Sequence, residues 1–224
     1  MLPSSTVENY LKAIYVGETQ LVAGQKLVPM GHLAAALGIA PGTATTMVKA
    51  LAESGLVAYE PYNGVRLTGA GEKLAARVLR RHRLIELFLV QVIGMNWDEV
   101  HDDAEQMEHV MSDRLIERID GMLGRPEFDP HGDPIPTADG QLAHRALESL
   151  LTCPMHTPVT VARVTDQDAA FLRFIESHHL KPGETIVVEA RDEVSDSVRL
   201  KGRNNERMTI GAKAASKLLV SSPG

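Results

Sequence analysis

Apolar side chains recur at helical spacing at the start of the chain. They run from Val7 to Tyr15 and predict an amphipathic helix over about residues 4–16. A short helix should follow over residues 30–37 and another over residues 41–54, because Pro41 stands at a favoured first helical position. Two short helices joined by a turn containing glycine indicate a helix-turn-helix unit.

Residues 56–67 show a different pattern, with two short strand-like runs on either side of Pro61-Tyr62-Asn63-Gly64. Asn-Gly is a strong hairpin signal, and a helix-turn-helix followed by a β-hairpin predicts a winged helix. Its second short helix would enter the DNA major groove. The candidate DNA contacts are Thr43, Thr45, Thr46 and Lys49 on that helix and Arg66 in the wing. The alternative is an ordinary helical hairpin with a threonine-rich surface.

Helical periodicity returns in the middle of the chain. A long helix should run from residue 69 or 70 to about residue 93, with Thr68 as its cap. Residues 96–99 have the form of a helix start, so a helix should continue from there to Met111, and a further helix should end near Leu123 before Gly124. The apolar faces of these helices need partners, and a homodimer would bury them.

The last third of the chain is richer in turn and strand residues. Residues 125–156 predict a tether with at most one short helix, over residues 143–150, and its histidines at 131, 144 and 156 are expected to be solvated or structural. Strand-like runs at 159–164, 185–190, 198–201 and 208–210, with a helix over 168–177, suit a small β-barrel. The predicted fold class is therefore mainly α with a β-rich C-terminal domain.

Composition narrows the class of protein. The chain has 44% hydrophobic residues, one cysteine and a net charge of -6, with no apolar run long enough to cross a bilayer, so a cytoplasmic protein is expected. The charge is unevenly spread, because residues 1–80 carry seven basic against five acidic side chains and the remainder 16 against 24. This asymmetry allows DNA contact at the N-terminal end and cation capture further on.

Histidines and acids cluster at helical spacing in the acidic part of the chain. On a helix of about 3.6 residues per turn, four of them would share an arc of roughly 100°. These four are His101, Glu105, Glu108 and His109, and His82 and Glu86 stand one turn apart on the preceding helix. Imidazole nitrogens and carboxylate oxygens on one face are what a divalent cation needs. A solvated acidic helix is the alternative, since Asp98, Glu99, Asp102 and Asp103 crowd the same segment.

With the loop 128–136, these segments resemble the diphtheria toxin repressor and manganese transport regulator family of metal-dependent transcription factors. The resemblance covers residues 1 to about 137 closely and the remainder loosely. It implies a winged helix-turn-helix domain (1–70), a helical metal-binding and dimerisation domain (71–137), a linker (138–156) and an SH3-like domain (157–224). It also implies a dimer that binds palindromic double-stranded operator DNA when metal is bound and controls metal-homeostasis genes.

The resemblance implies one metal site at Asn9, Glu105, Glu108 and His109 and an ancillary site at His82, Glu86 and His101. Iron-type members place Met and Cys at the positions of Asn9 and Glu105, so oxygen donors here favour Mn²⁺, with Fe²⁺ as the alternative. Manganese-type members place acids at the positions of Asn9 and Lys12, and a charged lysine cannot ligate. Asp166 or Asp168 of the SH3-like domain could complete the ancillary site.

The resemblance also implies a switch. A cation at the first site would tie the first helix to the dimer scaffold, whereas without metal several carboxylates of like charge should lie together and loosen that link. A metalloenzyme would need a substrate cleft and a nucleophile or general base, and the sequence shows no such motif, so no enzyme and no small-molecule substrate are expected. The main alternative is a winged-helix regulator that does not depend on metal.

Overall fold

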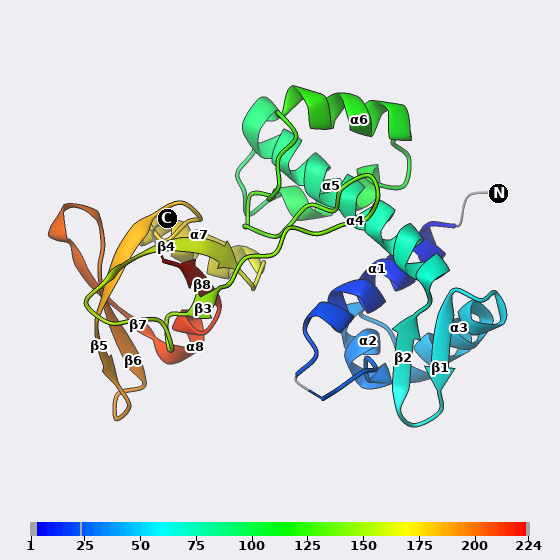
Figure 1. Cartoon of the computed structure of the whole chain (residues 1–224), viewed down its shortest axis with the longest axis horizontal. Helices are drawn as coiled ribbons and strands as arrows, with labels where there is room; N and C mark the ends of the chain where they lie inside the picture. Colours follow the sequence, from blue (N-terminus) through cyan, green and yellow to red (C-terminus); the bar gives the residue numbers. More distant parts are fainter. Residues whose placement is uncertain (1–3, 23, 223–224) are drawn as a thin grey trace. The chain divides into compact units, whose positions relative to one another are not determined.

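The computed structural model describes residues 4–22 and 24–222 and divides into two compact units (Figure 1). Unit 1 holds the described residues up to His82 together with residues 106–112 and 136–142. Unit 2 holds residues 83–105, residues 113–135 and the described residues from 143 onward. Helices predominate up to Met122 and strands follow in the C-terminal part, so the predicted fold class is confirmed.

Three helices and a hairpin form most of unit 1. They are α1 (Ser5–Thr19), α2 (Met30–Ala36), α3 (Pro41–Glu53), β1 (Val57–Glu60) and β2 (Gly64–Leu67). The turn between α2 and α3 is closed by Gly38, whose φ of 64° favours glycine. The predicted winged helix-turn-helix is therefore present, with bounds close to the predicted ones.

The core of unit 1 fixes where the wing lies. Leu11 and Ile14 of α1, Leu33 of α2 and Val48 of α3 are all buried in one apolar cluster with Val65 of β2. Strands β1 and β2 pair antiparallel along their whole length. A Cβ at Gly64 would lie 2.4 Å from the Val28 carbonyl oxygen, so the hairpin requires glycine there.

Helix α4 (Gly69–Phe88) leads out of the wing and continues as a π-helical turn, η1 (Leu89–Ile93), as far as the predicted end of the helix. Helices α5 (Val100–Met107) and α6 (Asp113–Met122) follow. The prediction for α5 was wrong at both ends, since the helix begins only at Val100 and stops at Met107, and Glu108 and His109 lie in the turn beyond it. None of the helices described here is long and apolar enough to cross a membrane.

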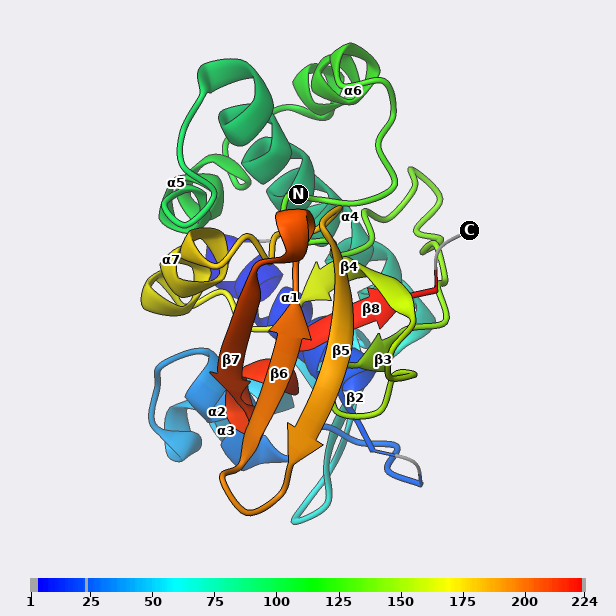
Figure 2. The ribbon, with the colours of Figure 1, turned by 90° about the vertical axis from the view of Figure 1, so that its left-hand side faces the viewer.

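The C-terminal part of unit 2 is a six-stranded antiparallel sheet in the order β3-β8-β4-β5-β6-β7. Its strands are β3 (Glu148–Ser149), β4 (Pro158–Val164), β5 (Thr185–Asp192), β6 (Ser197–Lys201), β7 (Arg207–Gly211) and β8 (Leu218–Ser221). Figure 2 shows β5, β6 and β7 side by side. Register shifts in the β4·β8 and β5·β6 pairs mark bulges, which bend a sheet.

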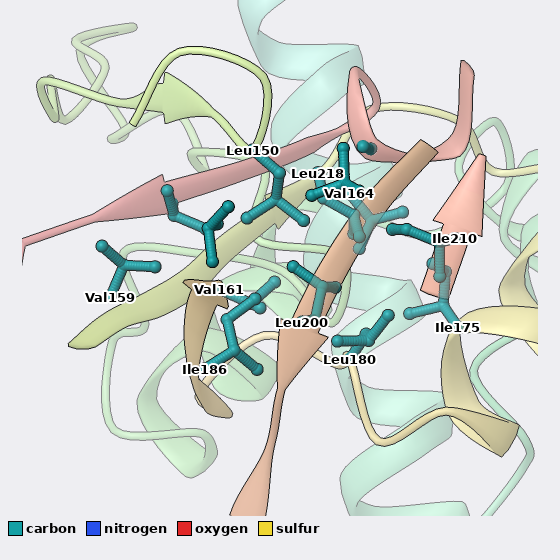
Figure 3. Close-up of a cluster of buried hydrophobic side chains, with 14 of the residues drawn as sticks. Leu150, Val159, Val161, Val164, Ile175, Leu180, Ile186, Leu200, Ile210 and Leu218 are labelled. Carbon is teal, nitrogen blue, oxygen red and sulfur yellow. The ribbon is translucent and has the colours of Figure 1, made fainter. Parts of the chain in front are cut away.

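Short helices complete this part of the chain: α7 (Ala169–Ser177), the 3₁₀ turn η2 (Arg203–Asn205) and α8 (Ala212–Ala215). Buried side chains of the strands and of α7 form the core of the sheet, with Val161, Leu200 and Ile175 among those drawn in Figure 3. The short helix considered for residues 143–150 is absent, and β3 forms at its end instead. Residues 148 and 149 gain a paired strand there, because β8 offers them a free edge.

The segment 128–135 packs against β4 within unit 2. The Val164 N–H donates to the His131 carbonyl at 2.8 Å, and Arg163 forms an ion pair with Asp133. A Cβ on Gly132 would lie 1.9 Å from the Ala162 carbonyl oxygen, and its φ is 84°. This close approach fixes the neighbouring histidine, so the segment is an ordered part of unit 2 rather than a tether.

Candidate metal centre

The carboxylate of Glu108 is the centre of a buried polar cluster in unit 1. Its side chain has 0% exposure, and both of its oxygens have partners. Lys12 Nζ of α1 lies 2.8 Å from Oε1 and 3.1 Å from Oε2, and His82 Nδ1 of α4 lies 2.7 Å from Oε2. A buried carboxylate is stable only when paired in this way or bound to a metal.

His109 lies beside this carboxylate, and one of its ring nitrogens already has a hydrogen-bond partner. Its Nδ1 lies 2.6 Å from Glu8 Oε2 and donates its proton to that carboxylate, so in the neutral ring the lone pair is on Nε2. The Nε2 atom is buried without a hydrogen-bond partner and lies 3.5 Å from Glu108 Oε1. A carboxylate that fixes the tautomer of a histidine is a common outer partner of metal-binding histidines.

Asn9 adds a further ligand atom that has no partner. Its Oδ1 on α1 is buried and has no hydrogen-bond partner among the residues that the structure describes. Such a group costs roughly 1–3 kcal/mol if nothing satisfies it. The amide oxygen of Asn9, the carboxylate of Glu108 and Nε2 of His109 are a donor set that fits a hard to borderline divalent cation.

Charge in this cluster is balanced without a metal ion. Lys12 pairs with Glu108, and Arg81 Nη1 lies 3.6 Å from Glu8 Oε1. Each of these two acids, Glu108 and Glu8, therefore has a basic partner. A cation that binds Glu108 has to compete with Lys12 for the same oxygens.

A second buried cluster lies in unit 2. Glu86 of α4 and Asp129 and His131 of the 128–135 segment offer ligand atoms within 4.8 Å of one another, and all three are buried. His131 Nε2 lies 3.0 Å from the Trp97 carbonyl oxygen and donates to it, so in the neutral ring the lone pair is on Nδ1. That Nδ1 is buried without a hydrogen-bond partner. The expectation that His131 is solvated was wrong, because the residue is only 1% exposed, whereas a structural role agrees with its hydrogen bond to the Trp97 carbonyl and its stacking on the Trp97 ring.

Electrostatics in this second cluster also suit a cation. Burial raises the pKa of the Asp129 carboxyl well above its usual range, and the charges of Asp133 and Glu86 raise it further, while Arg83 lowers it. The Oδ1 atom of Asp129 accepts backbone N–H bonds from His131 and Asp133, whereas the buried Oδ2 has no hydrogen bond among the described residues and lies 3.7 Å from Arg83 Nε. A divalent cation bound at Oδ2 would offset the repulsion among these acids.

The remaining predicted ligands are less enclosed. His101 of α5 is half exposed, with Nδ1 3.3 Å from Glu86 Oε1 and Nε2 3.9 Å from Glu105 Oε1. The candidates from the SH3-like domain have other partners. Asp166 forms an ion pair with Lys217, which lowers the pKa of its carboxyl, and Asp168 caps α7 by accepting from the Phe171 N–H.

The candidate DNA contacts lie on the surface of unit 1. Thr43, Thr46 and Lys49 are exposed at successive turns of α3, and Arg66 is exposed on β2. The hydroxyls of Thr45 and Thr46 both donate to backbone carbonyl oxygens of the preceding turn, at 2.9 and 3.0 Å, and Thr45 is the weakest candidate because it is half-buried.

Comparison with known proteins places these features in one family. Residues 3–65 match the family model "Iron dependent repressor, N-terminal DNA binding domain". Residues 68–137 match "Iron dependent repressor, metal binding and dimerisation domain", and residues 148–222 match "FeoA domain". The HTH-type transcriptional regulator MntR of Lysinibacillus sphaericus is 34% identical over 129 residues, which are 58% of this chain and 89% of that protein. The chain belongs to the iron-dependent repressor family.

Longer matches within this repressor family extend over almost the whole chain. The iron-dependent repressor IdeR of Mycobacterium leprae is 29% identical over 229 residues, 98% of this chain and 89% of that protein. A solved structure described as a manganese-dependent transcriptional repressor in complex with manganese is 39% identical, covers 97% of this chain and 100% of that chain, and has a TM-score of 0.88. The chain is therefore a transcriptional regulator of this family and not an enzyme.

Sequence reasoning missed three residues of these clusters. Glu8 precedes the predicted ligand Asn9, and neither periodicity nor spacing marks it as the partner of His109. Asp129 and His131 lie in a segment rich in Pro, Gly and Asp. The resemblance of the loop 128–136 to the repressor family marked the segment, but it did not single out these two residues as ligands.

Proposed function

We propose that the chain is a manganese-responsive transcriptional repressor that binds palindromic operator DNA as a homodimer. The observation that carries the proposal is the set of buried donors Asn9 Oδ1, Glu108 and His109 Nε2. Asn9 belongs to α1 of the winged helix, and the other two belong to the turn after α5. A cation held by all three would connect these segments and fix the position of α1.

Oxygen and imidazole donors favour Mn²⁺ over softer or later metals, with Fe²⁺ as the alternative. Cys153 is buried in the core of the C-terminal sheet and is no part of either cluster. The solved relative at 39% identity is described as a complex with manganese, which supports the same choice. The family resemblance adds Glu105 to the first site and His82, Glu86 and His101 to an ancillary one.

We infer a second ion position at Glu86, Asp129 and His131. The buried His131 Nδ1 and Asp129 Oδ2, neither of which has a hydrogen bond among the described residues, support it. Asp129 and His131 come from the segment that Gly132 holds against β4. An ion there would join α4 to the SH3-like domain inside unit 2, so its main effect would be on the stability of this unit.

DNA recognition is assigned to Thr43, Thr46 and Lys49 on α3, with Thr45 as a minor contributor and Arg66 as a phosphate contact from the wing. A palindromic operator requires two copies of the chain. Exposed apolar side chains in unit 2 offer a surface for the second copy: Val92, Ile93, Leu115 and Met122 are 47–66% exposed. The family description of residues 68–137 as a dimerisation domain supports this assignment.

The coupling between metal and DNA follows from linkage. If the cation favours one position of α1, and that position suits the operator, metal binding raises the affinity for DNA. DNA must then raise the affinity for metal by the same factor. Metal-loaded protein then binds the operator, and chelation releases it.

The test is an operator mobility shift with Mn²⁺ and with chelator, on the wild-type protein and on Glu108→Ala and His109→Ala. Both variants should lose metal-dependent DNA binding while sizing chromatography shows an intact dimer. His144→Ala, at an exposed histidine, is the matched control and should behave as wild type. Operator binding that is unchanged by chelator would refute the proposal and favour a metal-independent regulator.

A further inference from the structure

Lys12 occupies the approach to the central carboxylate of unit 1. Its ammonium contacts both oxygens of Glu108, at 2.8 and 3.1 Å, and its side chain is only 12% exposed. His82 holds Oε2 from another side. A lysine ammonium carries a full positive charge, so Lys12 is the group that neutralises this buried carboxylate.

An ammonium and a divalent cation cannot share this carboxylate at low cost. Both would lie within about 3 Å of the same two oxygens, in a place where water does not screen their repulsion. The stem of Lys12 is flexible enough to move its ammonium away, because about four carbons with rotatable bonds separate it from the backbone. Metal binding at Glu108 therefore requires Lys12 to leave at least one oxygen.

We propose that Lys12 is an internal competitor of the divalent cation for Glu108. In the metal-free protein it neutralises the buried carboxylate and keeps α1 beside the turn after α5. In the metal-bound protein it is displaced, so its hold on Glu108 sets the metal concentration at which the protein responds. This inference rests on the proposed function of the site and names the residue that regulates its threshold.

The competitor role and a purely structural role predict opposite results for the removal of the charge. A competitor stabilises only the metal-free form, so replacing Lys12 with a neutral residue weakens that form and tightens metal binding. A residue that merely positions Glu108 stabilises both forms, so its loss disorders the ligand and weakens metal binding. The sign of the change in affinity separates the two.

The experiment compares the wild-type protein with Lys12→Gln and with Lys12→Arg, which keeps the positive charge. Calorimetric titration with Mn²⁺ gives the affinity of each binding step. The binding step that is lost in Glu108→Ala is the one at the Glu108 site. Thermal unfolding with and without saturating Mn²⁺ gives a second readout that does not involve DNA. Lys12→Gln should bind Mn²⁺ about tenfold more tightly or better, because the competing charge is gone. It should also show a lower metal-free Tm with a larger rise on adding Mn²⁺, whereas Lys12→Arg should bind no more tightly than wild type.

Equal or weaker Mn²⁺ binding by Lys12→Gln would overturn the proposal. Lys12→Met, which keeps the aliphatic length of the side chain, gives the same comparison if Lys12→Gln does not fold. If Glu108→Ala binds Mn²⁺ as the wild-type protein does, the proposed function of the site is refuted instead. The two failures are therefore distinguishable in one set of titrations.

Discussion

Glu8→Gln tests whether the acid next to the predicted ligand prepares His109 for metal. The substitution keeps the shape of the side chain and removes its charge. In the wild type, Glu8 Oε2 lies 2.6 Å from His109 Nδ1, and the two side chains are only 9% and 15% exposed. A hydrogen bond to a charged group is worth about 1.5–3 kcal/mol, and burial at this level leaves little screening by solvent.

The expected effect is a loss of Mn²⁺ affinity by about 10- to 100-fold, or about 1.4–2.7 kcal/mol, the usual range for an outer partner of a metal-binding histidine. The neutral amide of the variant can still accept the Nδ1 proton but without charge, so the favoured tautomer of His109 is less populated. The same variant should need more Mn²⁺ for half-maximal operator binding, by the same factor. Calorimetric titration and a mobility shift at graded Mn²⁺ measure the two quantities.

Glu18→Gln is the matched control on the same helix. Burial raises the pKa of the Glu18 carboxyl, which accepts a hydrogen bond from the Leu67 N–H at 2.8 Å in the wing. Its substitution should alter stability and leave Mn²⁺ affinity unchanged. The reasoning fails if Glu8→Gln keeps full affinity. It also fails if Glu8→Gln loses the ion completely, since Glu8 would then be a ligand itself.

Three further predictions concern other parts of the molecule. Glu105→Cys should shift the order of activating metals away from Mn²⁺ toward Co²⁺ or Ni²⁺ without changing operator preference; an unchanged order in metal titrations would place selectivity elsewhere. Gly132→Ala should lower stability by more than about 2 kcal/mol and remove one bound ion, because the added Cβ would meet the Ala162 carbonyl oxygen at 1.9 Å; a wild-type Tm would contradict this. Lys49→Ala should weaken binding to all DNA sequences and reduce the slope of log affinity against log salt by about 1, and a loss confined to the operator would instead make Lys49 a base contact.

Local sequence signals determined most of the fold. The spacing of apolar residues and the positions of Pro41, Gly38 and Gly64 predicted the winged helix to within a few residues, because these features act on neighbouring backbone. The strands β4 to β7 and the helix α7 were predicted for the same reason. The resemblance of the His- and acid-bearing segments to a metal-dependent repressor family was likewise visible in the sequence alone, and the family comparisons confirm it.

Tertiary structure alone decided how the side chains of the candidate metal centre are arranged. The bond between Lys12 and Glu108 joins positions 96 residues apart, and the bond between Glu8 and His109 joins positions 101 apart. No local pattern shows which ring nitrogen of a histidine keeps its lone pair, since the partner of the other nitrogen fixes it. The same holds for His131, which periodicity leaves in a loop and the packing of Gly132 on β4 places beside Glu86. Sequence supplied the ligand types, and only the long-range contacts determined which of them are buried, paired or ready to bind an ion.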